Sequence, residues 1–231
     1  MELYIFGVVF SLIIMFALLG VILFFWFKKR SKENELSKKG KMTEMMINEK
    51  LSLWANINDA LYIPSSMYKY GKNKIFEVDG ILLTTRALIC IEVKNINAKR
   101  IYGTGNEKEW VKEVGTNKYM IKSPIMQNNK HIDHIVQMTD IKLPTVSLII
   151  FDSISCKEVN INNVPGHVVV IRSNEINQTL EGIMTALIPK ISKNEIEKMF
   201  EKLKEHQTND KKDKELLLSF TKEYNEKTFT I

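Results

Sequence analysis

Cysteine and histidine are scarce in this chain, and their scarcity removes several classes of protein. Only two cysteines and four histidines occur among the 231 residues, and no Cys or His pair completes a zinc ligand set. Cys90 and Cys156 are most simply reduced thiols, so a disulfide scaffold is not expected. Neither a glycine-rich phosphate loop nor a Gly-x-Ser-x-Gly nucleophile elbow is present. The usual patterns of zinc modules, nucleotide-binding loops and serine hydrolases are thereby excluded.

Charged side chains are missing from a long N-terminal stretch, residues 3–27. As a helix with ~1.5 Å per residue this stretch would be about 37 Å long, which is enough to cross a bilayer. A cleaved signal peptide fits less well, because no basic segment precedes the apolar run and no small-x-small site follows it. The sequence "KKRSK" follows at once, so the positive-inside rule predicts a single-pass protein of the cell membrane with its N-terminus outside and its C-terminal domain in the cytoplasm.

Positive charge is concentrated directly after the apolar stretch. The net charge of the chain is +6, and residues 28–50 hold eight Lys or Arg and four Glu. This basic flank suits a contact with anionic lipid. The remainder is only mildly basic, which is weak evidence for a nucleic-acid partner. We divide the chain into a transmembrane helix, a basic juxtamembrane tether, a folded domain and a charged C-terminal helical tail, at residues 1–27, 28–42, 43–189 and 190–231.

Helices and strands are mixed along the folded part, without an internal repeat. Apolar spacing predicts a helix over 43–59, and Ser123 with Pro124 marks the start of another. Short apolar runs bounded by glycines predict strands between them, two of which are joined by a turn at Thr85 and Arg86. This order predicts an α/β fold in which one central mixed sheet is flanked by helices.

The strand "LICIEVKNI" carries an acid and a base among apolar residues. Side chains alternate on a strand, so Glu92 and Lys94 share one face and Val93 lies on the other. If the four residues 84–87 form the loop to the preceding strand, Asp79 faces Glu92 directly. A loop with an odd number of residues would instead place the two carboxylates on opposite faces.

Two facing carboxylates repel each other, so a shared proton, a cation or Lys94 must offset the repulsion. A hard divalent cation fits best, because carboxylate oxygens suit Mg²⁺ or Mn²⁺. Lys94 could hold an attacking water or stabilise the charge that develops on a phosphate. From spacing alone a second interpretation stays open, in which Glu92 and Lys94 form a solvated strand edge and Asp79 belongs to a turn.

The same residues resemble a known family. The run "FEVDGILLTTRALICIEVKN" is similar to the D…ExK core of the PD-(D/E)xK nuclease superfamily, and more closely to its nuclease-related domain, called NERD. The resemblance rests on Glu49 in "INEKL", followed in order by "VDG", "IEVKN", "IYG", "EW" and "PIMQN", over about residues 48–140. The sequence departs from the family at Asn48, where glycine is usual, and at Gly80, where histidine is common after the aspartate.

The resemblance implies a restriction-endonuclease-like sheet with a metal site at its centre. Asp79 and Glu92 would bind Mg²⁺ or Mn²⁺, and the Val93 carbonyl would be a third ligand. Lys94 would position the attacking water.

Two further roles follow from the same resemblance. Gln127 would support the site from its helix, and Glu49 would be an outer acidic helper. His131 and His134 lie one turn apart on the helix of Gln127, and we expect them to be surface or substrate-facing groups. Glu77 shares the face of Asp79 and could reach the metal, but we expect it to be an exposed strand residue.

The implied activity is the hydrolysis of phosphodiester bonds in nucleic acid, DNA before RNA, by an enzyme held at the membrane. The alternative is a non-catalytic module of the same fold that binds nucleic acid or a protein partner there. The presence of Asp79, Glu92 and Lys94 together favours the enzyme. The mild basicity of the domain favours the module, because a nuclease needs phosphate contacts.

Trp110 is expected to pack in the core of the domain.

Overall fold

The computed structural model describes residues 19–21, 23–24, 26–28, 38, 40–71, 74–140, 142–152 and 154–228. Contacts within the chain define two compact units, Met1–Met45 and Met46–Ile231. The second unit contains all strands and the candidate site.

The predicted transmembrane segment lies mostly outside the described residues. Of residues 3–27, only 19–21, 23–24 and 26–27 are described, and they are helical. Within the described ranges no helix is both long and apolar enough to cross a bilayer. The membrane span, and the localisation deduced from it, stay predictions.

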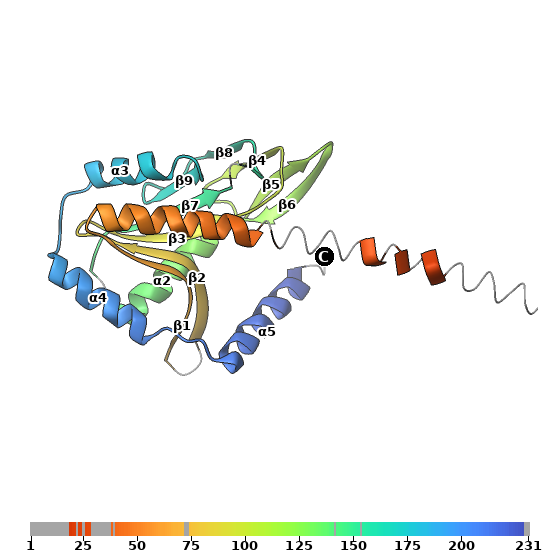
Figure 1. Ribbon diagram of the computed structural model, residues 1–231. Helices are drawn as coiled ribbons and strands as arrows, with labels where there is room; N and C mark the ends of the chain where they lie inside the picture. Colours follow the sequence, from red (N-terminus) through yellow and green to blue (C-terminus); the bar gives the residue numbers. More distant parts are fainter. Residues whose placement is uncertain are drawn as a thin grey trace, which may run out of the picture. The chain divides into compact units, whose positions relative to one another are not determined.

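A five-stranded mixed sheet forms the centre of the second unit (Figure 1). Its order is β1-β2-β3-β7-β9, with bounds Leu61–Tyr70, Lys74–Leu83, Leu88–Lys94, Thr145–Phe151 and Val168–Arg172. Strands β1, β2 and β3 are antiparallel, whereas β3, β7 and β9 are parallel. The middle strands are covered on both faces, which explains the apolar runs 88–91 of β3 and 148–151 of β7.

A second, four-stranded sheet corrects the prediction of a single sheet. Its order is β6-β5-β4-β8, with bounds Asn117–Lys122, Glu109–Val114, Arg100–Thr104 and Val159–Asn162. Trp110 of β5 is fully buried, as expected, and lies in an apolar cluster with Phe151 of β7. A Cβ at Gly103 would be 2.4 Å from the Trp110 ring, so this glycine allows the ring to approach β4. The cluster also contains Ile149 of β7 and Val168 of β9, so it joins the small sheet to the large one.

Helices cover both faces of the large sheet. Residues 40–57 are helical, and the other helices are α2 (Pro124–Thr139), α3 (Ile176–Ala186), α4 (Lys193–Glu205) and α5 (Lys211–Thr228). Residues 47–55 and α3 share one apolar cluster with Leu82, Ile89 and Ile91. Helices α2 and α4 share another, on the opposite face, with Ile81, Leu83 and Cys90. The prediction of an α/β fold with flanking helices is confirmed.

The register between β2 and β3 is the one that a four-residue loop predicts. Gly80 pairs with Ile91 and Leu83 pairs with Leu88, so residues 84–87 form the loop. Thr84 fixes it, because its buried hydroxyl donates to the Ala87 carbonyl and accepts from the Ala87 N–H. The β2–β3 pairing ends at Gly80, so Asp79 is the first residue of β2 beyond the paired stretch.

Candidate active site

The Asp79 side chain bonds to β3 at the point where the backbone pairing of β2 and β3 ends. Its Oδ2 accepts a hydrogen bond of 2.8 Å from the Val93 backbone N–H. The carboxylate therefore crosses to the neighbouring strand and is fixed one residue beyond Glu92. The two carboxylates come from adjacent antiparallel strands, as the even loop requires.

Glu92 and Lys94 lie on the face of β3 that α2 covers. Glu92 is 1% exposed, and its Oε1 is in direct contact with the Lys94 ammonium. Lys94 also donates to Gln127 Oε1 of α2 at 2.9 Å. Val93 packs on the opposite face, with the cluster of residues 47–55. The predicted division of the strand into two faces is confirmed, and Gln127 is brought to the lysine.

Burial makes the charged forms of both carboxylates unfavourable. It raises the pKa of Asp79, against the opposing effects of the Val93 N–H and of Lys94. It also raises the pKa of Glu92 to about 7, with the charge of Asp79 as the second cause and Lys94 opposing. The mutual repulsion expected from the sequence is thus only partly offset by the lysine.

One oxygen of Glu92 is unsatisfied. Glu92 Oε2 is buried and has no hydrogen-bond partner among the described residues. The imidazole of His131 faces it, with Nε2 at 3.6 Å. Burial, together with His134 and nearby lysines, lowers the pKa of His131 to about 4, so the ring is neutral at pH 7. The expectation of a surface or substrate-facing residue missed this position beside Glu92.

The donor set fits a hard divalent cation. Among the described residues no group of three or more His, Cys, Asp or Glu side chains comes together as a metal site. Mg²⁺, however, is commonly held by one or two carboxylates and keeps several waters. Asp79 and Glu92 supply two carboxylates with raised pKa values, and the free Oε2 is a lone-pair donor with nothing to bind. The Val93 carbonyl is the third group that the resemblance implies.

Residues 47–55 pack on the opposite face of the sheet from Glu92 and Lys94, and Glu49 is exposed. The Tyr62 hydroxyl donates to Asn48 Oδ1. A Cβ at Gly80 would be 2.8 Å from that hydroxyl oxygen. The two departures from the family pattern, Asn48 and Gly80, therefore contact the same tyrosine, one residue from Asp79. The role implied for Glu49 stays a prediction.

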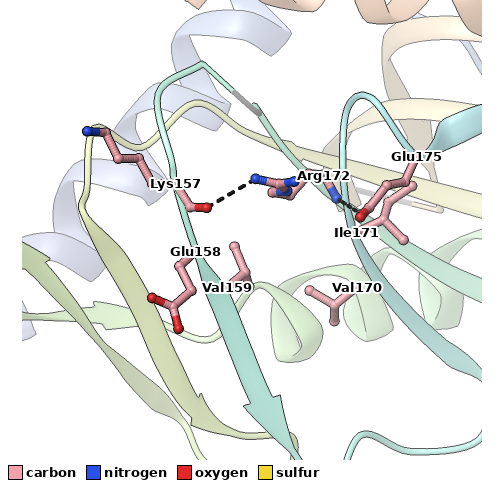
Figure 2. A pocket seen from close by; sticks show the side chains of 7 residues that line it. All are labelled: Lys157, Glu158, Val159, Val170, Ile171, Arg172 and Glu175. Atoms are coloured by element: carbon pink, nitrogen blue, oxygen red, sulfur yellow. Dashed lines mark hydrogen bonds between the residues drawn. The ribbon is translucent and has the colours of Figure 1, made fainter.

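A separate cavity of about 380 Å³ lies between β8 and β9 (Figure 2). Arg172 crosses its rim and donates to the Lys157 carbonyl at 3.1 Å, while Glu175 accepts from the Arg172 N–H at 2.8 Å. Arg172 pairs with Phe151, which in turn pairs with Lys94. The cavity is thus two strands away from the carboxylates, at the same end of the sheet, and it is not the site of the metal pair.

Comparison with known proteins identifies one family. Residues 39–152 match the family model of the nuclease-related domain, NERD. Searches of curated proteins and of solved structures found no match to the chain. The matched range includes Asp79, Glu92, Lys94 and Gln127, and the resemblance deduced from the sequence is confirmed. Strands β8 and β9 and helix α3 follow after the matched range.

Proposed function

We propose that this chain, with its nuclease-related domain at residues 39–152, is a divalent-metal-dependent nuclease that hydrolyses phosphodiester bonds. The observation that carries the proposal is the pair of carboxylates at the end of β2 and β3, in which a buried oxygen of Glu92 has no partner. A lysine held by a glutamine stands beside it. The large mixed sheet with helices on both faces suits the restriction-endonuclease-like architecture that the family implies.

Each side chain then has a stated task. Asp79, Glu92 and the Val93 carbonyl would hold Mg²⁺ or Mn²⁺, which when bound polarises the phosphoryl oxygen and lowers the pKa of a bound water. The Lys94 ammonium donates to the attacking water or to the charge that develops on the phosphate. Gln127 accepts from that ammonium and limits its orientations. Glu49 is proposed as an outer acidic helper.

Cations along α2 support nucleic acid as the substrate. Burial is the main cause of the lowered pKa values of His131 and His134, and the charges of Lys94, Lys130 and Lys74 add to it. Lys94 and Lys74 donate to Gln127 and Gln137 of α2, at 2.9 and 3.2 Å, and Lys130 lies on α2 itself. They supply phosphate contacts in a domain that is only mildly basic overall. The resemblance favours DNA over RNA as the substrate.

The alternative, a non-catalytic binding module, has one observation in its favour. The direct contact between Lys94 and Glu92 gives the acid a partner without a metal. In that case the pair is a buried salt bridge of β3, and the domain holds nucleic acid or a protein without cleaving it.

A membrane anchor is part of the proposal and rests on the uncharged residues 3–27 and the basic cluster that follows. A reporter fused after Ile231 should be active in the cytoplasm. Activity only outside the cell would contradict the proposed orientation, and transfer of the basic cluster to the N-terminus should weaken or invert it.

The catalytic proposal is tested by a cleavage assay on residues 31–231. Single-stranded and duplex DNA and RNA are incubated with Mg²⁺, Mn²⁺ or a chelator. Cleavage should need a metal and should disappear in Lys94→Ala. Lys198→Ala, which removes an exposed lysine of α4, is the matched control and should cleave as the wild type does. Binding without cleavage under every condition would favour the module.

A further inference from the structure

His131 is the second group of the site with an unsatisfied buried atom. Its Nδ1 has no hydrogen-bond partner among the described residues, and neither has Glu92 Oε2. The other ring nitrogen, Nε2, points at this oxygen from 3.6 Å. That distance is too long for a hydrogen bond but only about 0.4 Å beyond the usual range, which ends at about 3.2 Å.

The tautomer of His131 follows from these contacts. A neutral imidazole has one N–H donor and one acceptor nitrogen. If the proton were on Nδ1, a buried donor would lack a partner, and the lone pairs of Nε2 and of Glu92 Oε2 would face each other. With the proton on Nε2, the N–H faces a carboxylate oxygen that has no other donor. The second arrangement leaves only an acceptor unsatisfied.

Packing holds the ring in this orientation. His131 stacks on Phe76, with 6.2 Å between ring centroids and 21° between planes. It lies one helical turn after Gln127 on α2. Gln127 thus holds Lys94, Lys94 contacts Glu92 Oε1, and His131 faces Oε2. A carboxylate oxygen can accept more than one hydrogen bond. Each oxygen of Glu92 therefore keeps a lone pair for a cation when it contacts Lys94 or His131.

We propose that His131 is a positioning residue of the metal site, whose Nε2–H donates to Glu92 Oε2 and fixes the plane of this carboxylate for the cation shared with Asp79. This inference rests on the proposed function, since it needs a cation at Glu92. The hydrogen bond requires Nε2 and Oε2, which are 3.6 Å apart, to approach each other by about 0.4 Å. Loss of such a supporting partner typically lowers metal affinity by about 10–100-fold.

Three variants separate this role from simple packing. His131→Leu keeps an apolar body on Phe76 but removes the donor. His131→Gln keeps an N–H donor on a side chain of similar reach. His134→Leu is the matched control: its ring also stacks on Phe76, at 4.9 Å, but its Nδ1 is bonded to the Tyr70 hydroxyl at 2.7 Å and not to Glu92.

The test is Mn²⁺ binding to the full chain in detergent, measured by titration calorimetry and by electron paramagnetic resonance of free Mn²⁺. His131→Leu should bind Mn²⁺ about 10–100-fold more weakly, while His131→Gln and His134→Leu bind as the wild type does. The melting temperature of metal-free His131→Leu should not fall, because the lost group has an unsatisfied buried nitrogen.

Four outcomes would overturn the inference. Unchanged Mn²⁺ affinity in His131→Leu would show that His131 is not a donor to Glu92. Weakening in His131→Gln equal to that in His131→Leu would show the same, and both results would leave the proposed metal site standing. A fall in affinity matched by an equal loss of metal-free stability would assign His131 to packing. Absence of Mn²⁺ binding by the wild type would instead refute the proposed metal site itself, and the inference with it.

Discussion

Replacing Glu92 by glutamine should stabilise the metal-free domain, by an amount that depends on pH. The Glu92 side chain is 2% exposed, and burial together with Asp79 raises the pKa of its carboxyl group from 4.5 to about 7. The folded state therefore binds a proton more tightly than the unfolded state. Stability from this group is full below pH 4.5 and is lost as pH rises through 7.

The size of the effect follows from the same pKa values. At about 1.4 kcal/mol per tenfold change in proton affinity, the rise from 4.5 to about 7 corresponds to about 3 kcal/mol at pH values above 7. The raised pKa already includes the opposing attraction of Lys94. Glu92→Gln removes the ionisable group, so the difference in unfolding free energy between variant and wild type should grow from near zero to about 3 kcal/mol across this window.

The assay is urea unfolding of residues 31–231 in chelator, at steps from pH 4.5 to pH 8. His131 contributes the opposite slope, because its pKa falls from 6.5 to about 4 on folding and its contribution to stability rises between these values. The wild-type curve alone therefore combines opposing slopes, and the difference between variant and wild type isolates Glu92. A variant that is less stable by about 3–5 kcal/mol at every pH would refute this reasoning, because it would mean that Glu92 and Lys94 form a structural salt bridge.

Three further outcomes are expected. Asp79→Asn should leave the metal-free domain as stable or more stable, whereas Mg²⁺ should raise the melting temperature of the wild type only; an equal rise in both would exclude Asp79 as a ligand. Gly80→Ala should cost about 1–3 kcal/mol in urea unfolding, because its Cβ would be 2.8 Å from the Tyr62 hydroxyl, and the cost should shrink in a Tyr62→Phe background. Lys74→Ala and Lys130→Ala should each reduce the slope of log K against log salt concentration for single-stranded nucleic acid by about 0.7. Unchanged slopes would mean that the nucleic acid binds elsewhere on the domain.

The register of the two site strands was predictable because side chains on a strand alternate with a period of two. Once the loop at 84–87 has an even number of residues, Asp79 must lie opposite Glu92. Nothing comparable fixes which sheet a strand joins. Strand β4 pairs in parallel with β8, more than fifty residues later in the chain, and Trp110 of the small sheet packs against Phe151 of the large one.

The contacts of His131 and Asn48 could not be predicted from the sequence. His131 is polar and lies one turn after Gln127, a spacing that equally suits a solvated helix face. Only the packing of α2 on β3 brings it beside Glu92. Asn48 and Gly80 look like two unrelated departures until Tyr62 of β1 is seen between them.

The most direct test of the central claim is to separate metal binding from cleavage at β3. Mg²⁺ binding and DNA cleavage are measured on the same preparations of wild type, Lys94→Ala and Glu92→Gln. A nuclease site predicts that Lys94→Ala keeps Mg²⁺ binding and loses cleavage, while Glu92→Gln loses both, since it removes a ligand charge. Absence of Mg²⁺ binding by the wild type, or cleavage that survives in both variants, would contradict the assignment of Asp79, Glu92 and Lys94 as a metal-dependent catalytic centre.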